Sequence, residues 1–209
     1  MKSLRSHHNY VAGFTLAELV VAIAILGVVG VLIAKVQGDI FSFNRVFYSS
    51  FSGADQAQKL LRPMTAEIRS ASQSSNGAYP IDSFAANDFT FYSDINNDGL
   101  KDKVRYYLSG TSIYKEVTSP TGSPATYSAA NKKTTTFLTD VQNTSSGISL
   151  FRYFSSAYAG ADEGEIAPGG NVQDIRLVKV TIRIDADPNQ PPSAMDITTQ
   201  VSIRNLKQQ

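Results

Sequence analysis

Hydrophobic residues fill one long segment near the N-terminus and are spaced more widely afterwards. Residues 19–34 are sixteen residues without a charge, and extension back to Phe14 gives 21 residues. As a helix, this segment measures about 32 Å at about 1.5 Å per residue, which is enough to cross the hydrocarbon core of a bilayer. We therefore expect a transmembrane helix over about residues 14–34.

Helical spacing continues, less regularly, from Val36 to about Ser74. Several apolar positions recur three and four residues apart and should face a core: Leu60, Leu61, Met64, Ile68 and Ala71. The charged positions between them should face water: Lys59, Arg62, Glu67 and Arg69. We assign no salt bridge to Glu67. Pro63 removes one helical hydrogen bond and predicts a kink or local break. The turn-rich residues 72–77 predict the stop, so we expect a helix over residues 14–75.

After Asn76 the pattern changes from helical to strand-like. Aromatic and β-branched runs predict strands within four ranges: 89–93, 104–108, 113–117 and 151–154. Residues 118–133, which contain two prolines and a glycine, predict a loop. Apolar and polar residues alternate over 178–184 and again over 197–203, which predicts a long antiparallel hairpin with one buried face. The fold class is therefore α+β, with a long N-terminal helical spine packed on an antiparallel β-sheet. We expect residues 76–209 to form a β-rich globular domain.

Composition narrows the possible chemistry. The 209 residues include 19 basic and 18 acidic side chains, so the net charge of +1 gives no indication of a nucleic-acid partner. The sequence contains no cysteine, which excludes disulfides, thiol nucleophiles and cysteine metal sites. Its two histidines are His7 and His8, close to the N-terminus. We expect no enzymatic activity. A membrane-anchored hydrolase would need a Ser/Lys or paired-carboxylate site, and the sequence singles out no such pair.

The start of the apolar segment contains one carboxylate, Glu18. A lone carboxylate at this depth costs about 2.5 kcal/mol or more on insertion scales, so such a residue usually has a function and a partner. The residues from Gly13 read Gly-Phe-Thr-Leu-Ala-Glu and run directly into the apolar helix. Lys2 and Arg5 precede them, and the positive-inside rule keeps that end cytoplasmic. The alternatives are a plain signal anchor and a Glu18 side chain that only reaches towards the interface.

The segment from Gly13 to the apolar helix resembles the class III leader of type IV prepilins and type II secretion pseudopilins. In that family, a membrane-embedded prepilin peptidase cuts after the glycine and N-methylates the new first residue. The resemblance implies cleavage after Gly13, methylation of Phe14 and loss of a leader over residues 1–13. Gly13, Phe14, Thr15, Leu16 and Glu18 match the family pattern, and Ala17 stands where a bulkier aliphatic residue is common.

The same resemblance implies partners and a location. The partners are the prepilin peptidase, other pilins or pseudopilins, and the assembly platform. The chain would be a non-catalytic minor subunit that crosses the cytoplasmic (inner) membrane once, with its C-terminal domain extracytoplasmic, and later joins a filament. The order of helix and strands is similar to that of minor pseudopilins of the J type. Protein secretion, adhesion and DNA uptake all remain open as the role of the filament.

Physical chemistry suggests what Glu18 does in such a filament. Cleavage after Gly13 creates an α-amino group on Phe14, four residues before Glu18. The Glu18 carboxylate of one subunit could neutralise this amine of a neighbour in a low-dielectric surrounding, where a paired charge specifies register.

Residues 94–102 form a second candidate site. Asp94, Asn96 and Asp98 stand at alternate positions before Gly99, as in the first half of a calcium loop, and Asp102 holds the ninth position. The twelfth position is Arg105 rather than a bidentate glutamate, and the flanking segments read as strands. The possible ligands are Asp94, Asn96, Asp98 and Asp102. The alternative is a hairpin loop rich in turn-forming residues. A calcium-binding or adhesive domain that is anchored in the membrane, with no filament role, is the competing function.

Overall fold

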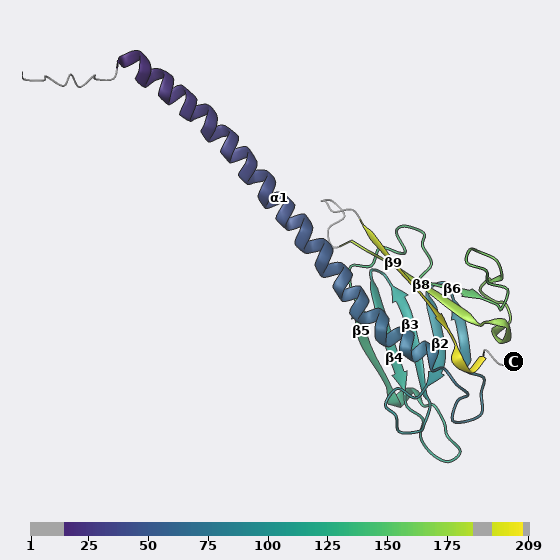
Figure 1. Cartoon of the computed structure of the whole chain (residues 1–209). Helices are drawn as coiled ribbons and strands as arrows, with labels where there is room; N and C mark the ends of the chain where they lie inside the picture. The colour runs from purple at the N-terminus through teal and green to yellow at the C-terminus, as the bar shows by residue number, and fades with distance from the viewer. Residues whose placement is uncertain (1–14, 186–193, 207–209) are drawn as a thin grey trace, which may run out of the picture. The chain divides into compact units, whose positions relative to one another are not determined.

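A computed structural model describes residues 15–185 and 194–206, without the side chains of residues 41–57 and 60. The chain divides into two compact units, residues 1–46 and residues 47–209. The first unit contains the N-terminal part of helix α1 (Leu16–Arg69), and the second contains the rest of that helix and the strands described below. Figure 1 shows these elements. The expected α+β architecture, an apolar N-terminal helix with antiparallel β-sheets, is confirmed.

Helix α1 runs through Pro63 without interruption, so the predicted break is wrong. Leu61, Met64 and Ile68 are buried on either side of the proline, and this packing offsets the loss of one hydrogen bond. The helix ends at Arg69, several residues before the predicted end at 75. It ends there because the chain turns towards the sheet. The Ser72 N–H donates to the Tyr92 carbonyl oxygen at 2.9 Å instead of extending the helix.

Five strands form the first sheet, an antiparallel meander in the order of the sequence. They are β1 (Ile81–Ala85), β2 (Asp88–Ser93), β3 (Asp102–Ser109), β4 (Ser112–Thr118) and β5 (Lys132–Leu138). The predicted strands at 89–93, 104–108 and 113–117 lie inside β2, β3 and β4. The predicted loop at 118–133 is confirmed over most of its length and contains the short helix η1 (Ala129–Asn131).

Four strands form a second antiparallel sheet, where the sequence suggested only one sheet. They are β6 (Phe151–Phe154), β7 (Glu165–Ile166), β8 (Leu177–Ile184) and β9 (Met195–Ser202), in the spatial order β7-β6-β8-β9. The short helices η2 (Val172–Asp174) and η3 (Arg204–Leu206) precede β8 and follow β9. The predicted C-terminal hairpin is confirmed, with Val178 opposite Val201 and Ile182 opposite Ile197.

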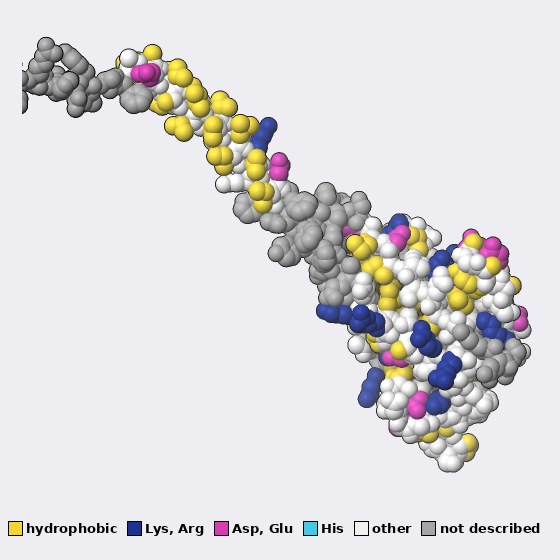
Figure 2. Space-filling view, in the orientation of Figure 1, with side chains coloured by type: hydrophobic (Ala, Val, Ile, Leu, Met, Phe, Trp, Pro, Cys, Tyr) yellow, Lys and Arg dark blue, Asp and Glu magenta, His cyan; other side chains and the backbone are white. Residues whose placement is uncertain are grey.

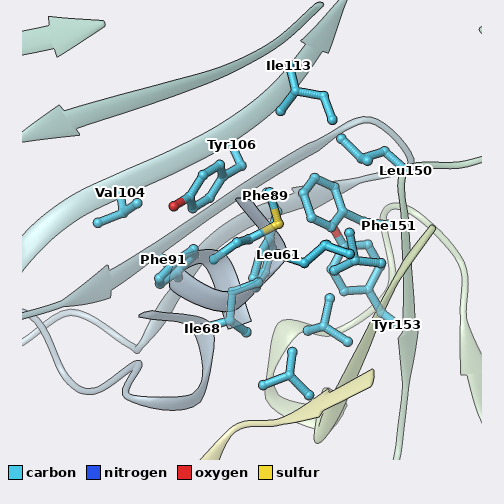
Figure 3. Close-up of a cluster of buried hydrophobic side chains, with 14 of the residues drawn as sticks. Leu61, Ile68, Phe89, Phe91, Val104, Tyr106, Ile113, Leu150, Phe151 and Tyr153 are labelled. Carbon is cyan, nitrogen blue, oxygen red and sulfur yellow. The ribbon is translucent and has the colours of Figure 1, made fainter. Parts of the chain in front are cut away.

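The core of the second unit joins the end of α1 to both sheets (Figure 3). Met64 and Ile68 of the helix have no exposed surface, and Leu61 and Ala71 are also buried, as predicted. Leu60 lies outside the described side chains. Phe89 of β2 contacts Phe151 and Tyr153 of β6, with ring centroids 5.7 and 5.3 Å apart. These aromatic contacts hold the two sheets together, because each ring removes a large apolar area from water.

One charged residue of the helix departs from the expectation. Arg62 and Arg69 are exposed, as predicted, but Glu67 does not face water. Its carboxylate lies 2.5 Å from Lys115 Nζ of β4 and accepts a 2.7 Å hydrogen bond from the Tyr106 hydroxyl of β3. The prediction failed because both partners come from strands far along the chain, which helical spacing cannot show.

Candidate functional site

The start of α1 is closed by a pair of residues, Thr15 and Glu18. The backbone N–H of Thr15 donates to Glu18 Oε2 at 2.9 Å, and the Thr15 hydroxyl donates to the same oxygen at 3.0 Å. The backbone N–H of Glu18 donates in turn to Thr15 Oγ1 at 3.3 Å. This reciprocal arrangement is a capping box, which satisfies donors that every helix leaves unpaired in its first turn. Such caps contribute about 0.5–2 kcal/mol to a helix.

This capping box assigns a role to Thr15 that the sequence reasoning missed. The signal was present, because a threonine followed three residues later by a glutamate, just before an apolar run, is typical of a helix start. Glu18 was expected to need a partner, and within its own chain that partner is Thr15. Both hydrogen bonds that Thr15 donates reach Oε2, and a carboxylate can accept bonds from further donors.

The helix after the cap is long and apolar enough to cross a membrane. This candidate span covers Leu16–Ile40, 25 residues with a mean hydropathy of 2.8. Its large hydrophobic side chains are exposed in the single chain, from 42% for Val29 to 80% for Leu16. Figure 2 shows the resulting apolar surface along this part of the helix. A continuous apolar surface of this kind needs lipid or another protein to cover it, which fits a membrane anchor.

The span extends beyond the predicted residues 14–34, as far as Ile40, and includes Lys35 and Asp39. Gly13 and Phe14, the predicted processing residues, lie outside the described residues. Their roles stay predictions.

The loop at 94–102 brings Asp94, Asn96 and Asp98 together. The Asp94 carboxylate accepts hydrogen bonds from the N–H groups of Asp98 and Gly99 at 3.2 and 3.0 Å, and Lys101 Nζ lies 3.3 Å from it. The Asn96 amide donates to Asp98 at 2.7 Å. Partial desolvation acts to raise the pKa of Asp94, but the hydrogen bonds from Lys101 and the loop backbone outweigh it and lower that pKa. The loop therefore stabilises the Asp94 carboxylate with its own groups.

Asp102 is placed differently from the other three predicted ligands. It is the first residue of β3, is only 2% exposed, and alternates with the buried Val104 and Tyr106 on the core side of the strand. Within the described ranges, no three His, Cys, Asp or Glu residues are grouped so that they could hold a metal ion. Calcium binding by Asp94, Asn96, Asp98 and Asp102 stays a prediction, and the geometry does not add Asp102 to the other three.

Comparison with known families finds a match at the N-terminus. Residues 8–34 match the family described as the prokaryotic N-terminal methylation motif. A comparison with curated proteins gives no match. The chain therefore carries a class III prepilin signal, and with an N-terminal apolar helix and antiparallel sheets it is type IV pilin-like.

Proposed function

We propose that the chain is a non-catalytic minor subunit of a type IV pilus or of a type II secretion pseudopilus. The observation that carries this proposal is the methylation motif at residues 8–34, which overlaps directly with the exposed apolar span of α1. In this proposal the prepilin peptidase cuts after Gly13 and methylates Phe14. Lys2 and Arg5 keep the leader cytoplasmic, and the β-rich domain, residues 76–209, lies outside the cytoplasmic membrane.

The apolar surface of the helix is covered first by the membrane and later by the filament. In the membrane it contacts lipid, and in the filament it contacts the equivalent helices of other subunits. Gly27 and Gly30 leave open space at the helix surface, where a neighbouring helix can approach closely. Heterologous contacts that repeat without closing produce a helical filament, and the apolar surface of this helix supplies such a contact. Minor pseudopilins of the J type are the subunits that this chain should resemble most in its role.

Glu18 has two functions in this proposal. Within its own chain the carboxylate caps α1 through Thr15, and in the filament it neutralises the Phe14 amine of a neighbour. The substitution Glu18→Gln separates the two functions, because an amide oxygen can still accept the hydrogen bonds from Thr15 but carries no charge. Glu18→Ala removes both functions and also a charge that is costly in a bilayer.

The experiment compares membrane and sheared-filament fractions of cells that express each chain. We expect wild type in both fractions, and both Glu18 variants in the membrane but strongly reduced in filaments. Glu163→Gln, an exposed carboxylate in the β-rich domain, is the matched control and should behave as wild type. Absence of the wild-type chain from filaments would contradict the proposed function. Normal incorporation of Glu18→Gln would leave Glu18 only its capping role.

A further inference from the structure

Two pockets line the junction between the end of α1 and strand β9. The first has a volume of about 270 Å³ and lies between Gln58, Leu61, Arg62 and Thr65 of the helix and Ile197, Thr198 and Thr199 of the strand. The second, of about 320 Å³, is lined by Arg69, Gln200, Ser202 and Arg204. The residues that line the second pocket come later in both the helix and the strand segment than those that line the first, so the two pockets follow one another along the junction. We call this surface, from Arg62 to Arg69 on the helix and from Ile197 to Arg204 on the strand, the α1–β9 groove.

The groove contains three arginines without a carboxylate partner. Arg62, Arg69 and Arg204 are exposed and form no ion pair with any residue that the structure describes. Elsewhere in the same unit, arginines meet carboxylates: Arg105 with Asp88, Arg152 with Asp162 and Arg183 with Asp196. A guanidinium stays charged at any physiological pH and offers a planar fork of donors that matches a carboxylate or a phosphate. The groove therefore carries positive charge that no carboxylate in the described part of this chain neutralises.

Among the residues that the structure describes, no strand pairs with the outer edge of β9, which lies along the groove. β9 is the last strand of its sheet, and β8 is its one neighbour in the sheet order. Ile197, Thr198 and Thr199 all line the first pocket although consecutive side chains point to opposite faces, so this pocket opens on the edge of the strand. Edge strands are commonly protected by proline or by several charges, but Met195–Ser202 holds no proline and one charge, Asp196, which Arg183 neutralises.

The groove is held in shape from both ends. Leu61 and Ile68 of the helix and Val201 and Ile203 of the strand segment are buried in the same core. At the far end, the Asn205 side-chain amide donates to the Ala71 carbonyl oxygen at 2.9 Å, which fixes the segment with Arg204 beside the end of α1. A surface that is already formed binds with less ordering cost than one that must fold on contact.

We propose that the α1–β9 groove docks an extended, acidic polypeptide segment of a neighbouring filament subunit. This inference rests on the proposed function and names its partner surface. The backbone of the incoming segment pairs with the edge of β9, and its carboxylates bind Arg62, Arg69 and Arg204. Arg62 and Arg69 are separated by about 10.5 Å along the helix, the length of about three residues of extended chain. A segment with two or three carboxylates within about five residues therefore fits.

The strand edge favours a polypeptide over the two other anionic partners. A nucleic acid or a lipid headgroup would use the arginines but has no backbone amides to pair with β9. Binding of nucleic acid also depends on neutralising many phosphates, whereas the chain as a whole carries a net charge of only +1. The charged groove and the open edge lie together, and an acidic strand uses both.

The test is photo-crosslinking of the full chain in its own cells. A photoreactive amino acid replaces Thr198, which is exposed in the first pocket. In the chain that is otherwise wild type, mass spectrometry should map the adduct to a segment of another pilin-like subunit with at least two acidic residues in about five. Arg69→Glu and Arg204→Glu should each reduce the adduct roughly tenfold. Lys133→Glu, the reversal of an exposed lysine of β5, is the matched control and should leave the adduct unchanged.

Each outcome decides the inference. Replacing an acidic residue of the mapped partner segment by arginine should restore the adduct in the Arg69→Glu chain. If Arg69→Glu had only caused a folding defect, this change in the partner would not restore the adduct. An adduct with lipid or nucleic acid, no adduct, or an adduct unaffected by Arg69→Glu would overturn the docking proposal. Leader cleavage and filament incorporation are measured in the same cells. If both are normal while the groove fails the test, only the docking inference is wrong. If both are absent, the proposed function itself is wrong.

Discussion

The ion pair between Glu67 and Lys115 should be the main polar link between α1 and the first sheet. The two side chains are only 15% and 18% exposed, and the Tyr106 hydroxyl donates to the second oxygen of the same carboxylate. Burial, together with the nearby Glu67 charge, raises the pKa of Tyr106, so this hydroxyl keeps its proton and remains a donor. The substitution Glu67→Gln keeps an acceptor for Tyr106 but leaves the Lys115 ammonium without its counter-charge.

The expected loss of stability follows from the exposure of the pair. Breaking a fully buried ion pair costs about 3–5 kcal/mol, whereas breaking an exposed pair costs about 0–1 kcal/mol. For this mostly buried pair we expect Glu67→Gln to lower the free energy of unfolding by about 2 kcal/mol. In a chain of this size, this loss corresponds to a fall in Tm of about 4–8 °C.

The assay is urea unfolding of the purified full chain in detergent, followed by the fluorescence of its ten tyrosines in the absence of tryptophan. Lys115→Met and the double variant complete a thermodynamic cycle, and the double variant should cost less than the two single changes added together. Glu163→Gln should change stability by less than about 0.5 kcal/mol because its carboxylate is exposed. The reasoning is refuted if Glu67→Gln is as stable as this control.

Two further predictions concern the loop at 94–102 and the outer face of the first sheet. Calcium would have to displace Lys101 from Asp94, so we expect only a small rise in Tm at about 10⁻³ M calcium and a larger rise in Lys101→Met. Equal Tm values with calcium and with chelator in both chains would show that the loop is only a turn. Desolvation acts to raise the pKa of Glu116, but Lys132 and Arg105 outweigh it and hold this pKa below its usual value. Glu116 therefore stabilises the fold above about pH 4.5, and this contribution is lost as the pH falls through its lower folded pKa. Between about pH 7 and about pH 3, the free energy of unfolding should fall less in Glu116→Gln than in wild type. If this free energy falls equally with pH in both proteins, the assignment is contradicted.

Local periodicity predicted the parts of the fold in which buried residues recur at the regular spacing of a helix or a strand. Met64 and Ile68 recur at helical spacing, and Val178, Val180 and Ile182 alternate along β8, so the buried face of each could be read directly from the sequence. β5 was missed because its residues, Lys-Lys-Thr-Thr-Thr-Phe-Leu, are mostly exposed at the sheet edge and give almost no hydrophobic alternation.

Contacts between distant segments could not be predicted in the same way. Lys115 lies 48 residues from Glu67, and nothing in helical spacing indicates that β4 carries its partner. The separation of the strands into two sheets depends on contacts such as that between Phe89 and Phe151, which join strands far apart in sequence. At the N-terminus, by contrast, Thr15 and Glu18 are close neighbours, so their capping box could have been predicted from sequence alone.

The most direct test of the proposed processing is the intact mass of the protein purified from membranes. In cells with an active prepilin peptidase, we predict a single species that begins at Phe14, lacks residues 1–13 and carries one N-terminal methyl group. Loss of Lys2 and Arg5 leaves 17 basic and 18 acidic side chains, so the side-chain charge changes from +1 to −1. The same chain from cells without the peptidase should retain Met1. A mature species that still begins at Met1 while the peptidase is active would contradict the proposed function.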